Sequence, residues 1–211
     1  MLFAFSEISA QQYKDPEYIK VTNDRAAKIV AKINLGNAKK ETDVTNVIAQ
    51  QFRDLSKIQD ERDAEIAKVK SGTLPKEKQN AEIEKHKANA NKSIDKLHAE
   101  YLKKLGKHLN EDKITEVKDG MTYGVLPVTV TAYNDMIPTL TKEEKEYIYN
   151  ALVEAREQAM DGGSSDEKHA WFGKYKGRIN NYLSKRGYDL TKEREGWKKR
   201  IEEREKAKTG K

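Results

Sequence analysis

Two long amphipathic stripes joined by a short turn constrain the fold of this chain more than any other feature. The first covers residues 43–71 and the second residues 75–109, with apolar side chains every three or four positions. This spacing is typical of α-helices that bury one face. A short Gly- and Pro-containing connection forces neighbouring helices to pack in opposite directions. The sequence therefore predicts a long antiparallel helical hairpin over about residues 40–109.

The outer part of this hairpin is polar. Between Gln59 and Asn91 the chain consists almost wholly of Lys, Glu, Asp, Gln, Asn and Ala. A helix pair with so little apolar surface cannot be buried on all sides, so we expect the tip to project into solvent. A protein partner that docks on the hairpin is one interpretation of this surface.

Five further helices follow from the same periodicity and from helix-capping signals. Thr141 with Glu144 and Ser164 with Glu167 have the spacing of capping boxes. The expected helices cover about residues 23–36, 111–118, 141–161, 166–185 and 191–206. The last of them has one apolar pair, Trp197 and Ile201, and is expected to pack lightly.

Residues 121–138 are the exception, because β-branched and aromatic residues alternate there with Gly and Pro. We expect one extended loop or short strands in this segment. The fold class is therefore all-α, with the hairpin packed with a C-terminal helical bundle. We expect a single helical domain over residues 13–207, whose motif-rich C-terminal half is 110–207.

Several kinds of chemistry are absent from the sequence. There is no Cys, the four His are scattered, and no phosphate-binding glycine loop occurs, so we expect no metal site and no cofactor. No apolar run approaches the roughly 20 residues needed to cross a bilayer, which predicts no membrane span. General acid–base chemistry on a glycan would need two carboxylates across a cleft, and the sequence leaves open whether the protein is an enzyme.

The formal charge of +6 is unevenly distributed. Residues 1–109 carry 21 basic and 16 acidic side chains, residues 110–165 carry 5 and 11, and residues 166–211 carry 15 and 8. A positive C-terminal region favours an anionic partner, although charge runs are usually solvated helix faces. Nucleic acid is an unlikely partner, because no nucleic-acid-binding motif accompanies the charge.

The N-terminus resembles the end of an export signal. Residues 1–5 are apolar, and Ser9 and Ala10 are small residues followed by Gln. A full signal has a basic region and an apolar stretch of about 7–15 residues, so residues 1–12 are interpreted as a truncated remnant. An ordinary frayed N-terminus is the alternative. The signal predicts a periplasmic or secreted protein.

The helix at 166–185 carries the strongest functional signal. At about 100° per residue, Phe172, Ile179 and Leu183 form a core face, and an aromatic strip lies beside cations and an amide. Aromatic rings stack on sugar rings, amides bind vicinal hydroxyls, and Arg pairs with carboxylates. Alternatively, the aromatic side chains belong to the core. The candidate ligand-binding residues are Trp171, Lys174, Tyr175, Arg178, Asn181, Tyr182 and, from the preceding segment, Tyr123.

Two observations sharpen this hypothesis. Gly173 and Gly177 each cost the helix about 1 kcal/mol relative to Ala, which favours close approach of another backbone or of a ligand. Arg178 needs either an anionic ligand or an internal carboxylate. The candidate partners, which are also the carboxylates considered for catalysis, are Asp135, Glu154, Glu157 and Asp161.

Several strings of the C-terminal half resemble a known family. They are Met121 to Gly124, Met136 to Pro138, Glu143 to Lys145, Glu154 to Asp161 and Lys168 to Leu190. These strings are similar to a family of exported Bacteroidetes proteins, domain of unknown function 3826, over roughly residues 20–200. The resemblance implies sugar binding beside polysaccharide-degrading enzymes, without an established activity.

Together these patterns predict an exported protein that binds a carbohydrate, with an acidic polysaccharide as one ligand class. A structural or protein-interaction helical module and a glycan-active enzyme are the alternatives.

Overall fold

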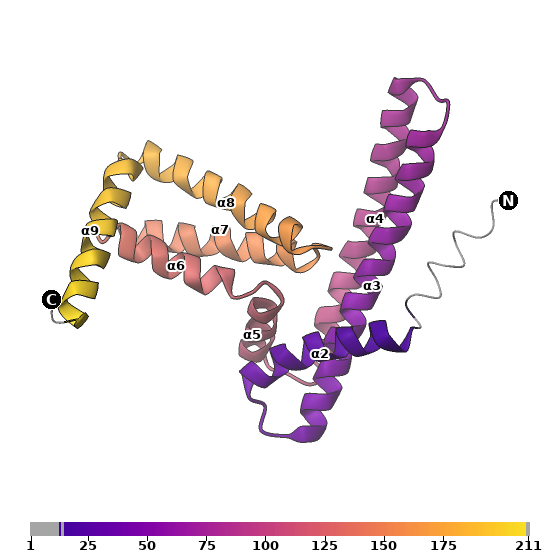
Figure 1. Ribbon diagram of the computed structural model, residues 1–211, viewed down its shortest axis with the longest axis horizontal. Coiled ribbons are helices and arrows are strands. Elements are labelled where there is room, and N and C mark those ends of the chain that lie inside the picture. Colours follow the sequence, from indigo (N-terminus) through magenta and orange to yellow (C-terminus); the bar gives the residue numbers. More distant parts are fainter. Residues whose placement is uncertain (1–12, 14, 210–211) are drawn as a thin grey trace. The chain divides into compact units, whose positions relative to one another are not determined.

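The computed structural model describes residues 13 and 15–209, which contain eight helices and no strand (Figure 1). This confirms the all-α prediction. The segment interpreted as an export remnant, residues 1–12, lies outside the described residues. The helices are α2 (Pro16–Ile33), α3 (Ala38–Ser71), α4 (Lys76–Leu105), α5 (Glu111–Met121), α6 (Val125–Met136), α7 (Lys142–Met160), α8 (Ser165–Lys185) and α9 (Leu190–Thr209).

The chain divides into two compact units after Val117. The first unit holds α2, α3, α4 and most of α5, and the second unit holds the end of α5 and the helices from α6 to α9. The expectation of a single domain over residues 13–207 stays a prediction.

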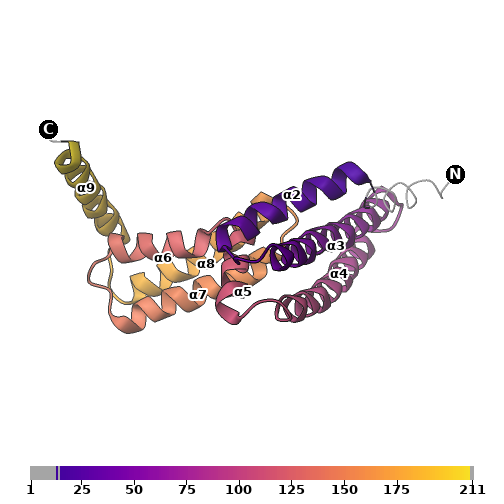
Figure 2. The same cartoon turned by 90° about the horizontal axis from the view of Figure 1, so that it is seen from below.

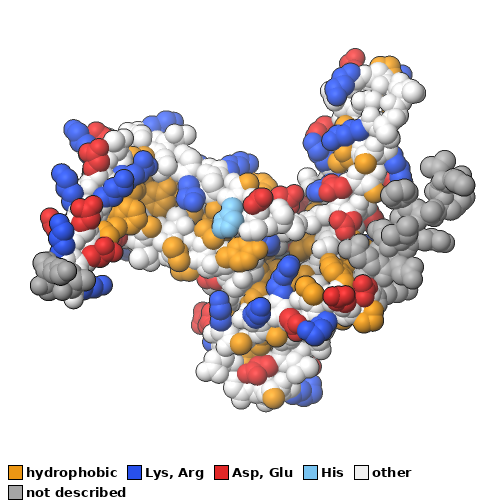
Figure 3. Space-filling view, viewed as in Figure 1, with side chains coloured by type: hydrophobic (Ala, Val, Ile, Leu, Met, Phe, Trp, Pro, Cys, Tyr) orange, Lys and Arg blue, Asp and Glu red, His pale blue; other side chains and the backbone are white. Residues whose placement is uncertain are grey.

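The first unit contains the hairpin expected from the sequence, with α3 and α4 side by side and antiparallel (Figure 1). Ile48, Leu55 and Leu105 are among the side chains buried near its base. None of the residues from 60 to 89 is buried, so the outer part of the hairpin is an arm. Figure 3 shows basic and acidic side chains mixed over this arm with a few apolar ones.

Helix α2 begins earlier than the apolar pattern indicates. Asp15 caps the helix by accepting from the Glu17 N–H at 2.9 Å, and Pro16 occupies its first position. Proline suits this position because the missing N–H would have no helical partner there. The helix ends where Asn34 adopts a left-handed conformation with φ 43°.

In the second unit α6, α7 and α8 lie side by side, and α9 lies at one end of this group (Figures 1 and 2). The expected core face of α8 is confirmed, because Phe172, Ile179 and Leu183 are fully buried. Tyr133 of α6 donates to Asn180 Oδ1 of α8 at 2.8 Å. Burial raises the pKa of Tyr133 to about 12, so its hydroxyl remains a donor at neutral pH.

The prediction of a loop or strands at 121–138 is wrong, because Val125–Met136 is helix α6. Its start uses Gly124 in the left-handed region, and Pro127 lies in the first turn, where proline is tolerated. Leu126 and Tyr133 are buried and Val130 packs against the same core. Burial of this helical stripe outweighs the β preference of the individual residues.

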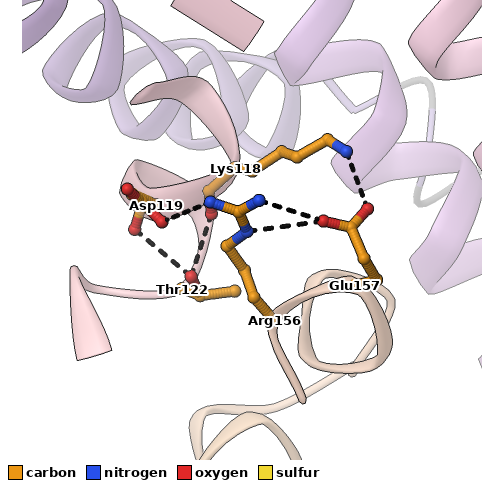
Figure 4. Close-up of polar contacts among 5 residues, drawn as sticks. All are labelled: Lys118, Asp119, Thr122, Arg156 and Glu157. Atoms are coloured by element: carbon orange, nitrogen blue, oxygen red, sulfur yellow. Dashed lines mark hydrogen bonds and ion pairs between the residues drawn. The ribbon is translucent and has the colours of Figure 1, made fainter. Parts of the chain in front are cut away.

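A buried ion-pair network joins the C-terminal end of α5 to α7 (Figure 4). Arg156 Nη1 lies 2.9 Å from Asp119 Oδ1, and its Nη2 lies 3.3 Å from Glu157 Oε1. Lys118 Nζ contacts the other oxygen of Glu157 at 2.7 Å. The Thr122 hydroxyl donates to the Lys118 carbonyl at 2.9 Å, which fixes the end of α5.

The capping box at the start of α7 is confirmed, and its glutamate also binds residues that follow α8. Thr141 Oγ1 accepts from the Glu144 N–H, and Glu144 Oε2 accepts from the Thr141 N–H at 2.9 Å. The same carboxylate accepts from the Tyr188 hydroxyl at 2.8 Å and from Arg186 Nε at 3.0 Å. Glu144 therefore ties the α8–α9 turn to the start of α7.

The second expected capping box forms only in part. Ser164 Oγ accepts from the Glu167 N–H at 3.1 Å, as predicted. The Glu167 carboxylate accepts from the Gly163 N–H at 2.7 Å instead of from Ser164. Lys168 is also buried in this turn, where its Nζ donates to the Ala159 and Met160 carbonyls at the end of α7.

Helix α9 is held by polar contacts that the apolar pattern does not reveal. Asp135, at the end of α6, accepts from Trp197 Nε1 at 2.7 Å and from both terminal nitrogens of Arg204. Hydrogen bonds from Arg204 and Trp197 hold the pKa of Asp135 below its ordinary value. Arg200 donates to the Asp135 and Met136 carbonyls, both at 3.0 Å. None of the described side chains of α9 is buried, which agrees with the expected light packing, whereas the polar contacts with Asp135 and Met136 were not predicted.

Asp135→Ala is expected to loosen α9 while the rest of the second unit keeps its structure. The substitution removes the acceptor for Trp197 and Arg204, so the backbone amides of α9 should exchange with solvent several-fold faster. Hydrogen–deuterium exchange followed by mass spectrometry measures this. Glu202→Ala, at an exposed position of α9, is the control. Equal exchange of α9 in the two variants would contradict the anchoring role of Asp135.

Candidate functional site

A groove of about 540 Å³ lies on the second unit between the N-terminal half of α7 and the C-terminal half of α8. Its position follows from helix geometry, because residues of α8 spaced by three or four lie along one face. The lining residues are Tyr147, Lys174, Gly177, Arg178, Asn181, Tyr182 and Lys185. Three cations and two aromatic rings thus share one surface.

The two tyrosines of the groove are stacked on each other. Tyr147 of α7 and Tyr182 of α8 have ring centroids 3.8 Å apart and an interplanar angle of 19°. Both rings are partly buried against the core of the second unit. Packing on the core fixes the orientation of the pair, which gives the groove a rigid aromatic wall.

Arg178 is held from several directions. Its Nη1 donates to Glu154 Oε2 at 2.8 Å, which makes Glu154 the partner among the four candidates. Its guanidinium carbon lies 5.6 Å from the Tyr175 ring centroid and 6.0 Å from that of Tyr147. The Tyr147 hydroxyl and then Glu154 raise the pKa of Arg178, so the side chain is always charged. Half of it remains exposed, and an exposed ion pair of this kind is weak.

Two of the predicted ligand residues lie under the cations and do not line the groove. The Trp171 ring is 4.8 Å from Lys174 Nζ, and the Tyr175 ring lies beneath Arg178. Both rings pack against the core, which agrees with the alternative interpretation of the aromatic strip. Their contacts orient the cations, because a cation over a ring face is attracted to it.

Tyr123 lies apart from the groove. It precedes α6 with φ 59°, its side chain is 60% exposed, and its ring stacks on His169 with centroids 5.8 Å apart. His169 lies near the start of α8, on a different face of that helix from the groove residues. The structure therefore does not bring Tyr123 together with the residues that line the groove, and ligand binding by Tyr123 stays a prediction.

The helix glycines have open space around them. A Cβ atom added to Gly173 or to Gly177 would meet no atom within 4 Å. The close backbone approach considered for these glycines is therefore absent among the described residues. Gly177 lines the groove, so its missing side chain leaves room there for a ligand.

The carboxylates considered for catalysis all have polar partners within the second unit. Asp135 anchors α9, Glu154 pairs with Arg178, and Glu157 pairs with Arg156 and Lys118. Asp161 also has a polar partner. In the described part of the chain, no three acidic or histidine side chains converge on a position where they could hold a metal ion.

Tyr147, Gly177 and Lys185 line the groove but are not among the candidate ligand-binding residues, although Gly177 was expected to approach a ligand or another backbone. Lys185 shares the helical face of Lys174 and Arg178, so its spacing could have indicated it. Tyr147 belongs to another helix, where it is part of an apolar stripe, and no local pattern connects it with Tyr182.

Comparison with known proteins gives a family and no curated relative. A family model described as "Protein of unknown function (DUF3826)" matches residues 19–203. No curated protein matches the chain. Among the described helices, none combines the length and the apolar character that spanning a membrane requires.

Proposed function

This chain belongs to the DUF3826 family of proteins of unknown function, so its activity has to be argued from the site, and we propose that the groove binds an anionic carbohydrate. The observation that carries the proposal is the composition of the lining. Lys174, Arg178 and Lys185 surround a stacked tyrosine pair, and the described lining contains no carboxylate.

Each part of the lining suits one part of a sugar acid. An aromatic face packs against the C–H groups of a pyranose, and the Asn181 amide both donates to and accepts from hydroxyls. Arg178 and the two lysines supply charge for a carboxylate, as cations do at sites that recognise carboxylates and phosphates. The groove volume lies within the usual range of about 300–1,000 Å³ for small-molecule sites. A polyuronate is therefore the ligand class that we propose.

The setting is part of the same proposal. A polyuronate lies outside the cytoplasm, and the export predicted from residues 1–12 would bring the protein to it. No step of bond cleavage is proposed, because the carboxylates near the groove are paired with cations.

The glycines of α8 offer a test that leaves the fold intact. Gly177→Trp is expected to fill the groove and to weaken binding to polygalacturonate or alginate at least tenfold. Gly173→Trp is the matched control, because it adds the same ring to the same helix at an open position outside the groove. Both substitutions remove a helix glycine, so neither should lower helix stability. Affinity electrophoresis in gels that contain the polysaccharide measures the effect.

Arg178→Ala extends the test to charge. It should weaken polyuronate binding with little change in melting temperature, because the exposed pair with Glu154 contributes about 0–1 kcal/mol. Binding by the unmodified protein should also fall as salt is added, because the cations are solvent-exposed. Equal retention of Gly177→Trp and Gly173→Trp, or failure of the unmodified chain to bind any polyuronate, would refute the proposal.

A further inference from the structure

One lining residue of the groove, Arg178, is paired with a carboxylate of the chain itself. Glu154 of α7 does not line the groove, yet its Oε2 accepts from Arg178 Nη1 at 2.8 Å. The two side chains are 50% and 51% exposed. An ion pair with this exposure is weak, so Glu154 can leave it for water at small cost. The contact shows that the exposed part of Arg178 is directed at a carboxylate.

Arg178 is held in place by more than Glu154. Its guanidinium carbon lies 5.6 Å from the Tyr175 ring centroid and 6.0 Å from that of Tyr147. Both rings pack against the core of the second unit, so they keep the cation in position when the carboxylate moves away. The contact with Glu154 joins one nitrogen to one oxygen, whereas arginine can bind a carboxylate through two parallel N–H groups. A ligand carboxylate can therefore replace Glu154 and bind Arg178 more completely.

The three cations of the groove form a row along α8. Lys174 precedes Arg178 by four positions and Lys185 follows it by seven, so all three lie on one side of the helix. At a rise of 1.5 Å per residue, the two lysines lie about 6 Å and about 10 Å from Arg178 along the axis. Lys174 lies over the Trp171 ring and Lys185 is exposed, so Glu154 covers one cation of the row. A single carboxylate cannot contact the whole row of about 16 Å.

We propose that Glu154 determines the specificity of the groove: its carboxylate competes with the ligand for Arg178, and the groove therefore selects polyuronate segments over single sugar acids. This inference rests on the groove as the carbohydrate site. A monosaccharide acid exchanges one carboxylate for another at Arg178 and gains little. A polyuronate segment that lies along α8 also contacts Lys174 and Lys185, and these contacts exceed the cost of displacing Glu154.

Isothermal titration calorimetry of the full chain with hexagalacturonate and D-galacturonate tests this competition. The unmodified chain should bind the hexamer at least tenfold more tightly than the monomer. Glu154→Gln removes the charge but keeps the size of the side chain, and it should tighten hexamer binding about threefold to fivefold. Glu146→Gln is the matched control, because it removes the same charge from an exposed position of α7. It should change the affinity less than twofold at physiological ionic strength, where exposed charges are screened.

A double variant separates competition from a general effect of charge. In the Arg178→Ala background, Glu154→Gln should give no further gain, because Glu154 then has no cation to occupy. A gain of the same size in that background would overturn the inference, as would equal tightening by Glu146→Gln.

The remaining outcomes distinguish this inference from the groove proposal. If the unmodified chain binds hexagalacturonate and Glu154→Gln does not tighten it, the competition is overturned and the groove proposal stands. Equal affinity for monomer and hexamer would overturn the selection in the same way. Binding by Glu154→Gln alone would support the competition, although the unmodified chain would then fail the test of the groove. Absence of binding by both chains would overturn both proposals.

Discussion

Replacing Arg156 by methionine is expected to lower the free energy of unfolding by about 3 kcal/mol, because two carboxylates lose a buried partner. The Arg156 side chain is 5% exposed and lies between Asp119 and Glu157. About a quarter of each carboxylate is exposed, so water offsets part of the loss and the effect falls at the low end for buried pairs. Chemical denaturation followed by circular dichroism measures the change.

The double variant Arg156→Met/Asp119→Asn tests the electrostatic cause. Asparagine removes the charge that the single variant leaves unpaired, whereas Glu157 keeps its contact with Lys118. The double variant should therefore recover about 1 kcal/mol relative to Arg156→Met. Unchanged stability of Arg156→Met would show that the network does not stabilise the fold, and further loss in the double variant would contradict the electrostatic cause.

Glu144→Ala is expected to cost about 2–3 kcal/mol at pH 7. Burial raises the pKa of the Glu144 carboxyl, but hydrogen bonds from the Thr141 N–H, Tyr188 and Arg186 outweigh burial and lower it to about 2. Glu144 is only 2% exposed, so solvent cannot replace these bonds. Thermal and chemical denaturation measure the loss. Glu143→Ala is the control, because Glu143 precedes Glu144 in the chain and its side chain is 76% exposed.

The same carboxylate predicts a dependence of stability on pH. The pKa in the folded chain is about 2, and the pKa of an unfolded glutamate is about 4.3, so folding favours the charged form. The stabilisation is complete above the unfolded value and is lost as pH falls from about 5 to about 2. The stability difference between the original chain and Glu144→Ala should therefore shrink over this interval. A constant difference from pH 7 to pH 2 would contradict the assigned cause.

The hairpin and the core face of α8 were predictable because both depend on local periodicity. Helix α6 obeys the same rule, since Leu126, Val130, Tyr133 and Ile137 follow helical spacing. The β preference of its Val and Thr residues suggested strands, yet the spacing of these four residues is the signal that matched the structure.

Contacts between distant helices were not predictable. The capping box identified Glu144, but nothing local indicates that Tyr188 and Arg186 bind it. In the groove, spacing on α8 places Lys174, Arg178 and Asn181 on one surface, whereas Tyr147 arrives from α7 through packing. Ligand binding by any of these residues stays a prediction.

The number of helical turns in the hairpin arm can change without loss of the core. Because none of the residues from 60 to 89 is buried, removing equal numbers of turns from α3 and α4 takes away no buried apolar side chain. The exposed turn at Gly72 to Pro75 is the kind of site where an inserted domain is tolerated. The arm can therefore be lengthened or shortened one helical turn at a time without a change to the buried core of the first unit.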